Sequence, residues 1–351
     1  MSEFAILTPS AQVAAHLRGE LLRGRWSGTM PGVPTLAAEL EIDPKTAGLA
    51  LHLLEVEGLL VGQGAGRARR IELPKGLAAP ALRVGILPYE DLNRRLDYMV
   101  DLRHKLVEAG HLAFFASKTL VELEMDVKRI QRLVAASGAD AWVVISAPRA
   151  VLEWFATQPV PAFALFGRRR SLRIAGTGPD HVPAMRAAVQ RLAALGHRRI
   201  VVIERRAAES NSVTRAALEE MAQLGLPTGP YNLPVWDDTA AGLRRLLDEL
   251  FRFTPPTALI IDEAFLFHAA KEHLAQKGIL APRDVSLVCI DGDPTFEWCE
   301  PSVAHIRWDS RPVLRQIMRW ADHVARGRKD LRQTLTHAEF VDGGTAGPAT
   351  S

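Results

Sequence analysis

Acidic side chains follow two short apolar segments in the last third of the chain. Asp291 comes directly after residues 287–290, and Asp262 and Glu263 come directly after residues 258–261. If both segments are parallel strands, their carboxyl ends meet at one edge of a sheet, where ligands bind in such folds. A carboxylate there can accept hydrogen bonds from neighbouring hydroxyl groups of a ligand. We expect Asp291, and one or both of the other acids, to bind a small molecule; the alternative for Asp291 is a structural ion pair.

Other polar and aromatic residues occupy similar places, and for each we keep two interpretations: contact with a ligand, or packing in the core or an interface. Five of them follow predicted strands between residues 82 and 166, namely Tyr89, Asp91, Ser117, Ser146 and Phe166. Five more are aromatic residues that could stack on the ring of a ligand, namely Trp154, Trp236, Phe296, Trp298 and Trp308. We add the first five to the acids as candidates for a ligand site.

Motifs of catalysis and of cofactor binding are missing from the sequence. It contains no G-x-S-x-G, no phosphate-binding P-loop, no H-E-x-x-H and no C-x-x-C. Its two cysteines, Cys289 and Cys299, form neither a disulfide framework nor a zinc pattern. The G-x-G-x-G at residues 62–66 is followed by a few alternating basic and apolar residues, whereas a dinucleotide-binding loop must open a helix. We therefore expect no enzyme, no metal and no cofactor.

From residue 82 onward, short apolar segments alternate with longer amphipathic ones. This alternation predicts parallel sheets with helices on both faces. The predicted strands are residues 82–87, 111–116, 141–145, 162–166, 199–203, 231–235, 258–261 and 285–290, and the predicted helices are about 94–109, 121–137, 180–195, 212–224, 238–251 and 264–277. These are too many strands for one comfortable sheet, so we expect an α/β domain of two doubly wound lobes with a cleft between them.

The first 73 residues have a different pattern, of three helices and a hairpin. Thr8 caps a first helix that ends at Gly24, Pro34 opens a second, and Asp43 caps a third. Residues 59–61 and 67–73 then form two strands around the glycine-rich turn. This is the order of a winged helix-turn-helix, in which the third helix enters the major groove of DNA and the wing lies on the backbone or the minor groove.

Charge bears on how such a head would bind DNA. Residues 1–75 contain eight basic and eight acidic residues, and the whole chain has a net charge of only +3. Because neutralisation of phosphates supplies most non-specific affinity, a neutral head predicts weak binding by a monomer and a modest dependence on salt. Dimerisation would have to supply the difference. The candidate DNA contacts are Thr35, Lys45, Thr46, Arg67, Arg69 and Arg70; for the three arginines the alternative is a solvated strand edge.

The head resembles that of GntR-type bacterial regulators. The resemblance covers about residues 10–73 and rests on LLRGRW at 21–26, MPG at 30–32, LAAEL at 36–40, Thr46, AL at 50–51 and LEVEGLL at 54–60. Where that family usually places arginines that contact DNA, this chain has Pro34, Pro44 and Gly48. The recognition helix is left with Lys45 and Thr46 as its obvious polar contacts.

Residues 82–345 resemble the effector domain of LacI/GalR regulators. The resemblance rests on GHRRI at 196–200, PPTAL at 255–259, Gly278 with PRDVSLV at 282–288, and Ile290-Asp291 with PSVAHI at 301–306. It implies the fold of periplasmic sugar-binding proteins, a sugar-like effector between the lobes, and contact of the effector with Asp291. The effector-binding arginine of the family falls on Thr214 or Arg215, with Ala217 in place of the usual glycine.

Together these features predict a DNA-binding transcription regulator, a repressor more readily than an activator, controlled by a small molecule that is a sugar or a sugar derivative. Its expected partners are a roughly palindromic double-stranded DNA operator, the effector and a second copy in a homodimer. The alternative is a small-molecule-binding protein whose head makes protein contacts and no longer binds DNA.

The expected boundaries follow from composition. Residues 1–73 form the DNA-binding domain, 74–81 a proline-bounded linker, 82–345 the effector-binding and dimerisation domain, and 346–351 a flexible tail. No run of about 18 apolar residues and no signal-peptide pattern is present, so we expect a cytoplasmic protein without a membrane partner.

Overall fold

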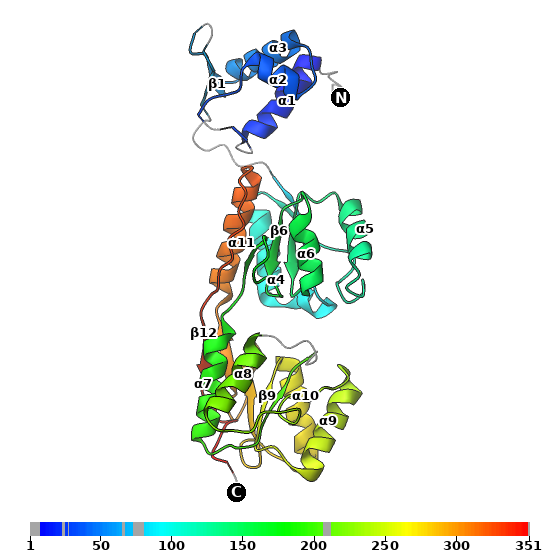
Figure 1. Ribbon diagram of the computed structural model, residues 1–351, viewed down its shortest axis with the longest axis vertical. Coiled ribbons are helices and arrows are strands. Elements are labelled where there is room, and N and C mark those ends of the chain that lie inside the picture. The colour runs from blue at the N-terminus through cyan, green and yellow to red at the C-terminus, as the bar shows by residue number, and fades with distance from the viewer. Residues whose placement is uncertain are drawn as a thin grey trace. The chain divides into compact units, whose positions relative to one another are not determined.

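The computed structural model describes residues 8–22, 25–26, 28–64, 67–72, 81–205 and 212–349. The chain divides into two compact units, Met1–Thr177 with Leu314–Thr334 and Gly178–Val313 with Leu335–Ser351. We call residues 8–72 the head, the rest of the first unit the first lobe, and the second unit the second lobe (Figure 1). Gly24, the turn residues Ala65 and Gly66, and linker residues 74–80 lie outside the described residues.

The head consists of three helices and a two-stranded hairpin. The helices are α1 (Pro9–Leu22), α2 (Val33–Glu39) and α3 (Pro44–Val56), and strands β1 (Leu60–Val61) and β2 (Arg70–Ile71) pair antiparallel. Asp43 caps α3 as the sequence predicts, because its carboxylate accepts the Lys45 backbone N–H at 2.8 Å. Leu17, Leu51 and Leu54 are fully buried between the helices. The apolar face of each helix therefore builds one small core.

The first lobe contains a five-stranded parallel sheet. Its strands are β3 (Arg83–Leu87), β4 (Leu112–Phe115), β5 (Ala141–Ile145), β6 (Ala162–Leu165) and β7 (Ala175–Thr177), in the order β4-β3-β5-β6-β7. Its helices are η1 (Asp91–Arg95), α4 (Asp97–Glu108), α5 (Val127–Ser137) and α6 (Arg149–Thr157), with much of α11 (Ser310–Ala325). Residues of α5 and α6 share one core cluster with Trp142 and Val144 of β5, so these two helices cover one face of the sheet.

The second lobe repeats this plan. Strands β8 (Ile200–Ile203), β9 (Ala258–Ile261), β10 (Ser286–Cys289), β11 (Ala304–Trp308) and β12 (Ala338–Val341) have the order β12-β11-β10-β9-β8, and only the β11–β12 pair is antiparallel. Helices α7 (His181–Ala194) and α8 (Ser212–Gln223) pack on one face, and α9 (Ala240–Phe253) and α10 (Ala264–Gln276) on the other. The predicted two-lobed α/β fold is thereby confirmed.

One predicted strand is wrong. Residues 231–235 form no strand, although Asn232 lies beside β8: its backbone oxygen accepts the Val202 N–H, and its side chain donates to the Ile200 oxygen, both at 2.8 Å. Pro230 and Pro234 flank this contact, and proline has no N–H for a strand ladder. Conversely, five observed elements were not predicted from the sequence, namely α6, β7, β11, α11 and β12.

The C-terminal segment is also corrected, because residues 346–349 are not a flexible tail. The Thr345 hydroxyl is fully buried; it donates to the Leu287 oxygen at 2.8 Å and accepts the Ala304 N–H at 2.9 Å. Beyond it, the Gly347 N–H donates to Ser286 Oγ at 2.9 Å and the Ala349 N–H to the Leu195 oxygen at 2.8 Å. The segment is held by the backbone groups of the second lobe; residues 350–351 are outside the described part.

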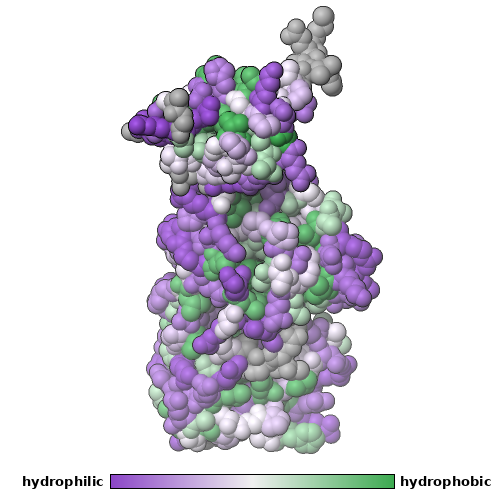
Figure 2. Space-filling view, turned by 45° about the horizontal axis from the view of Figure 1, so that its top comes forward, coloured by the Kyte–Doolittle hydropathy of each residue, from purple (hydrophilic) through white to green (hydrophobic). Residues whose placement is uncertain are grey.

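The surface is mixed in character. Figure 2 shows a face on which hydrophilic and hydrophobic residues interleave without a broad apolar band. The exposed large apolar residues include Val56 in the head, Leu112 in the first lobe and Trp298 in the second. Among the described residues, no helix has both the length and the apolar character needed to cross a membrane.

We predict that Thr345→Val destabilises the second lobe by roughly 2 to 4 kcal/mol, because it leaves two buried backbone groups without their partner. Thermal and urea unfolding of the full chain measure the effect. Thr228→Val, at an exposed position of the same lobe, is the matched control and should change little. Equal stability of both variants would show that the C-terminal segment does not stabilise the lobe.

Candidate ligand-binding site

Carboxylates meet at the carboxyl ends of three neighbouring strands of the second lobe. Ile203 of β8 pairs with Ile261 of β9, which pairs with Cys289 of β10. The acids that follow these strands therefore emerge at the same edge of the sheet: Glu204, then Asp262 with Glu263, then Asp291. Of these four, Glu204 was not among the predicted residues. The sequence pattern that predicted the other three also applies to Glu204, because it is an acid directly after a predicted strand.

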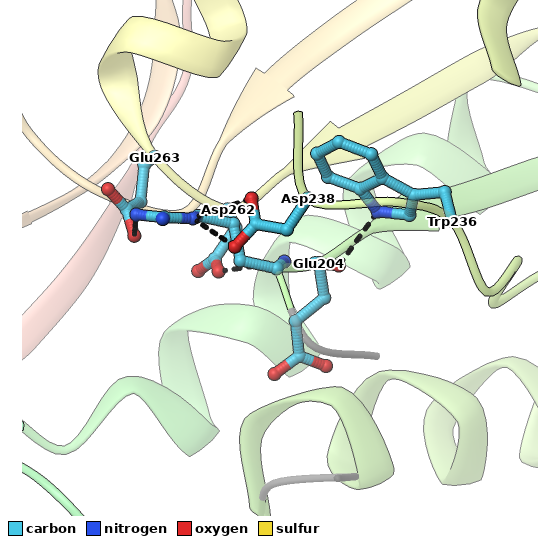
Figure 3. Close-up of polar contacts among 6 residues, drawn as sticks. Glu204, Trp236, Asp238, Asp262 and Glu263 are labelled. Carbon is cyan, nitrogen blue, oxygen red and sulfur yellow. Dashed lines mark hydrogen bonds and ion pairs between the residues drawn. The ribbon is translucent and has the colours of Figure 1, made fainter. Parts of the chain in front are cut away.

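Arg205 follows Glu204 in the sequence, and its side chain bonds to Asp238 and Glu263. Figure 3 shows Asp238 beside Asp262 and Glu263. The Arg205 Nε donates to both carboxylate oxygens of Asp238, at 2.9 and 3.0 Å, and its Nη1 lies 3.3 Å from Glu263 Oε1. The Arg205 side chain is only 13% exposed. The indole of Trp236 donates to the Glu204 backbone oxygen at 3.0 Å. The guanidinium therefore already has two acidic partners before any ligand binds.

The predicted choice between Thr214 and Arg215 is resolved by the direction of α8. Thr214 is buried and its hydroxyl donates to the carboxylate of Glu204, whereas Arg215 is exposed. Adjacent residues of a helix point about 100° apart, so only one of the two can face the strand ends. In this geometry Arg215 lies on the exposed side of α8 and away from the acids, and its contact with an effector stays a prediction.

Asp262 has an unusual protonation state. Burial raises its pKa from 3.8 to about 8, and the nearby charges of Glu263 and Glu204 add to the effect. A backbone hydrogen bond from Arg205 at 3.3 Å opposes it. Asp262 is therefore mostly neutral at pH 7, and a neutral carboxyl can donate as well as accept a hydrogen bond.

Asp291 belongs to a second polar group on the same edge. Its Oδ1 accepts the Trp308 indole N–H and the Gly292 backbone N–H, each at 2.9 Å. Burial raises the pKa of Asp291, and these bonds and nearby His181 oppose that shift. Burial also lowers the pKa of His181, whose buried Nε2 has no hydrogen-bond partner among the described residues. Sequence reasoning missed His181 because it reaches this edge from the start of α7, not from a strand.

The predicted ligand-binding residues of the first lobe differ from one another in burial and backbone conformation. Ser146 and Phe166 directly follow β5 and β6, and both have left-handed backbones, with φ of 48° and 59°. Such φ values are uncommon outside glycine and occur often at binding sites. Tyr89 is buried in the core cluster of α5 and α6, as the packing interpretation has it. Asp91 is exposed and lies 3.0 Å from Arg94 Nε, and Ser117 is exposed beyond β4.

The predicted aromatic residues also differ: two lie at the strand ends of the second lobe, two pack against other aromatic or core residues, and one is exposed. Trp308 and Trp236 donate hydrogen bonds at the strand-end group, as described above. Phe296 is buried in a core cluster, and Trp154 packs against Phe155 with ring centroids 4.7 Å apart. Trp298 is 89% exposed.

Two of the three predicted arginine contacts of the head are already paired with acids. Arg69 Nε lies 2.8 Å from Glu55 Oε1 of α3, and Arg70 pairs with Glu72. Arg67 forms no ion pair with any residue of the described part of the head. Lys45 and Thr35 are exposed and Thr46 is half-buried. One face of α3 thus presents Lys45 together with three further exposed side chains, Leu49, His52 and Val56.

Comparison with known proteins identifies the fold. Residues 189–346 match the profile of the family described as periplasmic binding protein-like domain, and no curated protein matches the chain. A LacI family transcriptional regulator from Enterococcus faecium with bound ribose is 16% identical, with a TM-score of 0.62 over 76% of this chain and 99% of that one. The lac repressor dimer bound to operator and the anti-inducer ONPF is 16% identical, with a TM-score of 0.61 over 79% and 99%.

A third structure covers more of the chain. The transcriptional regulator CelR in complex with cellobiose is 16% identical, with a TM-score of 0.63 over 90% of this chain and all of that one. At such identities the similarity establishes the fold, which is that of the two-lobed periplasmic binding protein-like domains.

We predict that the second lobe loses stability as the pH rises from about 4 to about 8, by at most about 1.4 kcal/mol per pH unit, through Asp262. Its pKa is higher in the folded than in the unfolded chain, so the folded state holds the extra proton and gives it up as the pH rises. Asp262→Asn, which resembles the neutral acid, should flatten this decline.

Urea unfolding of the full chain between pH 5 and 8 measures the difference. Glu249→Gln, at an exposed position of α9, is the matched control. If the wild type and Asp262→Asn decline in parallel over this range, Asp262 is not the titrating group.

Proposed function

We propose that this protein is a transcription regulator that binds an operator through its head and is controlled by a sugar-like small molecule bound at the strand ends of the second lobe. The observation that carries the proposal is the order of its parts: three helices and an antiparallel hairpin precede a domain with the periplasmic binding protein-like fold. The solved structures with this fold include regulators with bound ribose and with cellobiose. We infer that the chain acts as a repressor.

The chemistry of the strand ends supports a ligand rich in hydroxyl groups. Asp291 is held in place by Trp308 and Gly292 and keeps acceptor capacity on its second oxygen. Neutral Asp262 offers a donor and an acceptor, and the Nε2 of His181 lacks a partner among the described residues. A sugar hydroxyl is both donor and acceptor, so it can satisfy such a mixed set. A ligand changes operator affinity only if it binds one arrangement of the protein better than another.

The head fits a winged helix-turn-helix in which α3 enters the major groove and the β1–β2 hairpin is the wing. Lys45 and Thr46 would then face the bases, with Thr35 at the backbone and Arg67 on the wing. Arg69 and Arg70 would have to leave Glu55 and Glu72 for phosphates. Because this exchange adds little net charge, we expect a modest dependence of affinity on salt.

A homodimer is part of the proposal. Two heads on two half-sites offset the weak binding of each neutral head. The first lobe exposes three apolar side chains that a second copy could cover, Val100 and Val107 of α4 and Leu112 of β4. The solved lac repressor with this fold is a dimer on its operator.

DNA binding is tested by footprinting on the DNA upstream of the protein's own gene, at low and moderate salt, with and without a panel of sugars. We predict a palindromic footprint that one sugar removes. The double variant Lys45→Ala, Arg67→Ala should weaken operator binding at least about tenfold, because two phosphate or base contacts are lost, while sugar affinity stays unchanged. Arg103→Ala, on the exposed surface of α4, is the control and should bind like the wild type.

A second candidate function is a head that binds a protein instead of DNA. The specific observation in its favour is the apolar character of the exposed face of α3, where Leu49 is 49% and Val56 73% exposed. The neutral charge of the head agrees with it. A folded dimer that binds a sugar but gives no footprint at low salt would favour this function and exclude the first.

A further inference from the structure

The first lobe contains a cavity that is separate from the strand-end acids of the second lobe. It has a volume of about 740 Å³ and lies between α5 and the edge of the sheet formed by β4 and β3. Of the predicted ligand-binding residues, only Ser117 lines it. Its volume lies within the range of about 300 to 1,000 Å³ that is common for small-molecule sites.

The floor of the cavity is aromatic. Gly85 of β3 pairs with Phe114 of β4 on one side and with Trp142 of β5 on the other, so all three residues share one face of the sheet. The Trp142 ring lies against the bare backbone of Gly85, since a Cβ there would be 2.6 Å from Cζ3. The rings of Phe114 and Trp142 meet edge to face, with centroids 6.1 Å apart. Their arrangement forms an apolar surface beneath α5.

Helix α5 leaves this floor only partly covered. Among its described residues, only Ile130 is fully buried, whereas Leu133 is half-buried and Ala136 exposed, and both line the cavity. The indole N–H of Trp142 is buried and has no acceptor among the described residues. The packing between helix and sheet is therefore incomplete at the β4 edge, and this incomplete packing is what opens the cavity.

The rim is strongly basic. Arg83, Lys118, Arg129 and Arg132 line the cavity, against a single acid, Glu122. Arg129 pairs with Glu124 at 2.7 Å, but the other three cations form no ion pair with any described residue. The Arg83 guanidinium lies over the Phe114 ring, with its Cζ 4.7 Å from the centroid, and its Nε donates to the Ser137 oxygen at 3.2 Å.

We infer that this cavity binds an organic anion with an aromatic body, such as an aryl carboxylate. Its ring packs on Phe114, which the buried Trp142 ring supports from behind, and on Leu133 of α5. Its acid group accepts hydrogen bonds from the guanidiniums of Arg83 and Arg132. A neutral ligand gains the apolar contact but leaves the cations unpaired, and a cation is repelled. The charge of this site is opposite to that of the strand-end acids, so the two sites select different ligands.

The test uses 2-naphthoate as the probe and its neutral amide, 2-naphthamide, as the comparison, by titration calorimetry on the full-length protein. We expect saturable binding of one naphthoate per chain, with the amide at least about tenfold weaker. Arg83→Ala and Arg132→Ala should each weaken naphthoate about tenfold, which corresponds to the loss of one charge-assisted contact. Arg103→Ala, an exposed arginine of α4 outside the cavity, should bind like the wild type.

A second variant tests the cavity itself and not only its charge. Ala136→Trp adds an indole to the cavity wall and should abolish naphthoate binding while the protein keeps its thermal transition. Equal affinity for naphthoate and naphthamide, an equal loss in Arg103→Ala, or naphthoate binding that survives Ala136→Trp would each overturn the inference. The inference also fails if the wild-type dimer does not bind naphthoate but the Leu112→Asp variant, which sedimentation shows to be a monomer, does bind it. A second copy of the chain would then be the occupant of the cavity.

Discussion

The parallel, in-register pairing of β8, β9 and β10 is the constraint on which the site of the second lobe depends. Since Ile203, Ile261 and Cys289 are aligned, the acids that follow them are forced to one edge, where Glu204 is buried and the other three are half-buried. Burying several carboxylates together is costly unless each is paired, hydrogen-bonded or neutralised. All three solutions occur here: Arg205 pairs with Asp238 and Glu263, Trp308 donates to Asp291, and Asp262 holds its proton.

These solutions also decide which ligand suits the edge. Among the described residues at this edge, the one guanidinium is that of Arg205, which is already engaged by two acids, so a ligand with a carboxylate or phosphate would meet uncompensated negative charge. Hydroxyl groups avoid this cost because they can donate to Asp291 and both donate to and accept from neutral Asp262. The cavity under α5 has the reverse balance, with four cations against one acid, and three of the cations form no ion pair in the described part of the chain. One protein thus offers two environments of opposite charge on the same kind of sheet.

The strand ends were predictable where the signal is local. Asp262, Glu263 and Asp291 each follow an apolar segment, and that spacing is sufficient to place them; the same rule would have found Glu204. His181 could not be found in this way, because it reaches Asp291 through the packing of α7 on the sheet. The prediction of a strand at residues 231–235 was wrong for a related reason. Their apolar alternation indicates a strand, but Pro230 and Pro234 allow only one residue to pair with β8. The C-terminal segment has the composition of a tail, but the buried Thr345 hydroxyl and the N–H groups of Gly347 and Ala349 anchor it to the second lobe.

In the head, the ion pair between Arg69 and Glu55 determines how a neutral surface could bind DNA. The Arg69 and Glu55 side chains are each 25% exposed, so solvent screens their attraction, and such pairs contribute about 0 to 1 kcal/mol. Arg69 can therefore exchange Glu55 for a phosphate at small cost. Glu55 then remains beside the DNA backbone and repels it. In the proposed regulator, this acid would limit the affinity of each head for DNA as much as the number of its arginines does, and the second head of a homodimer would supply the difference.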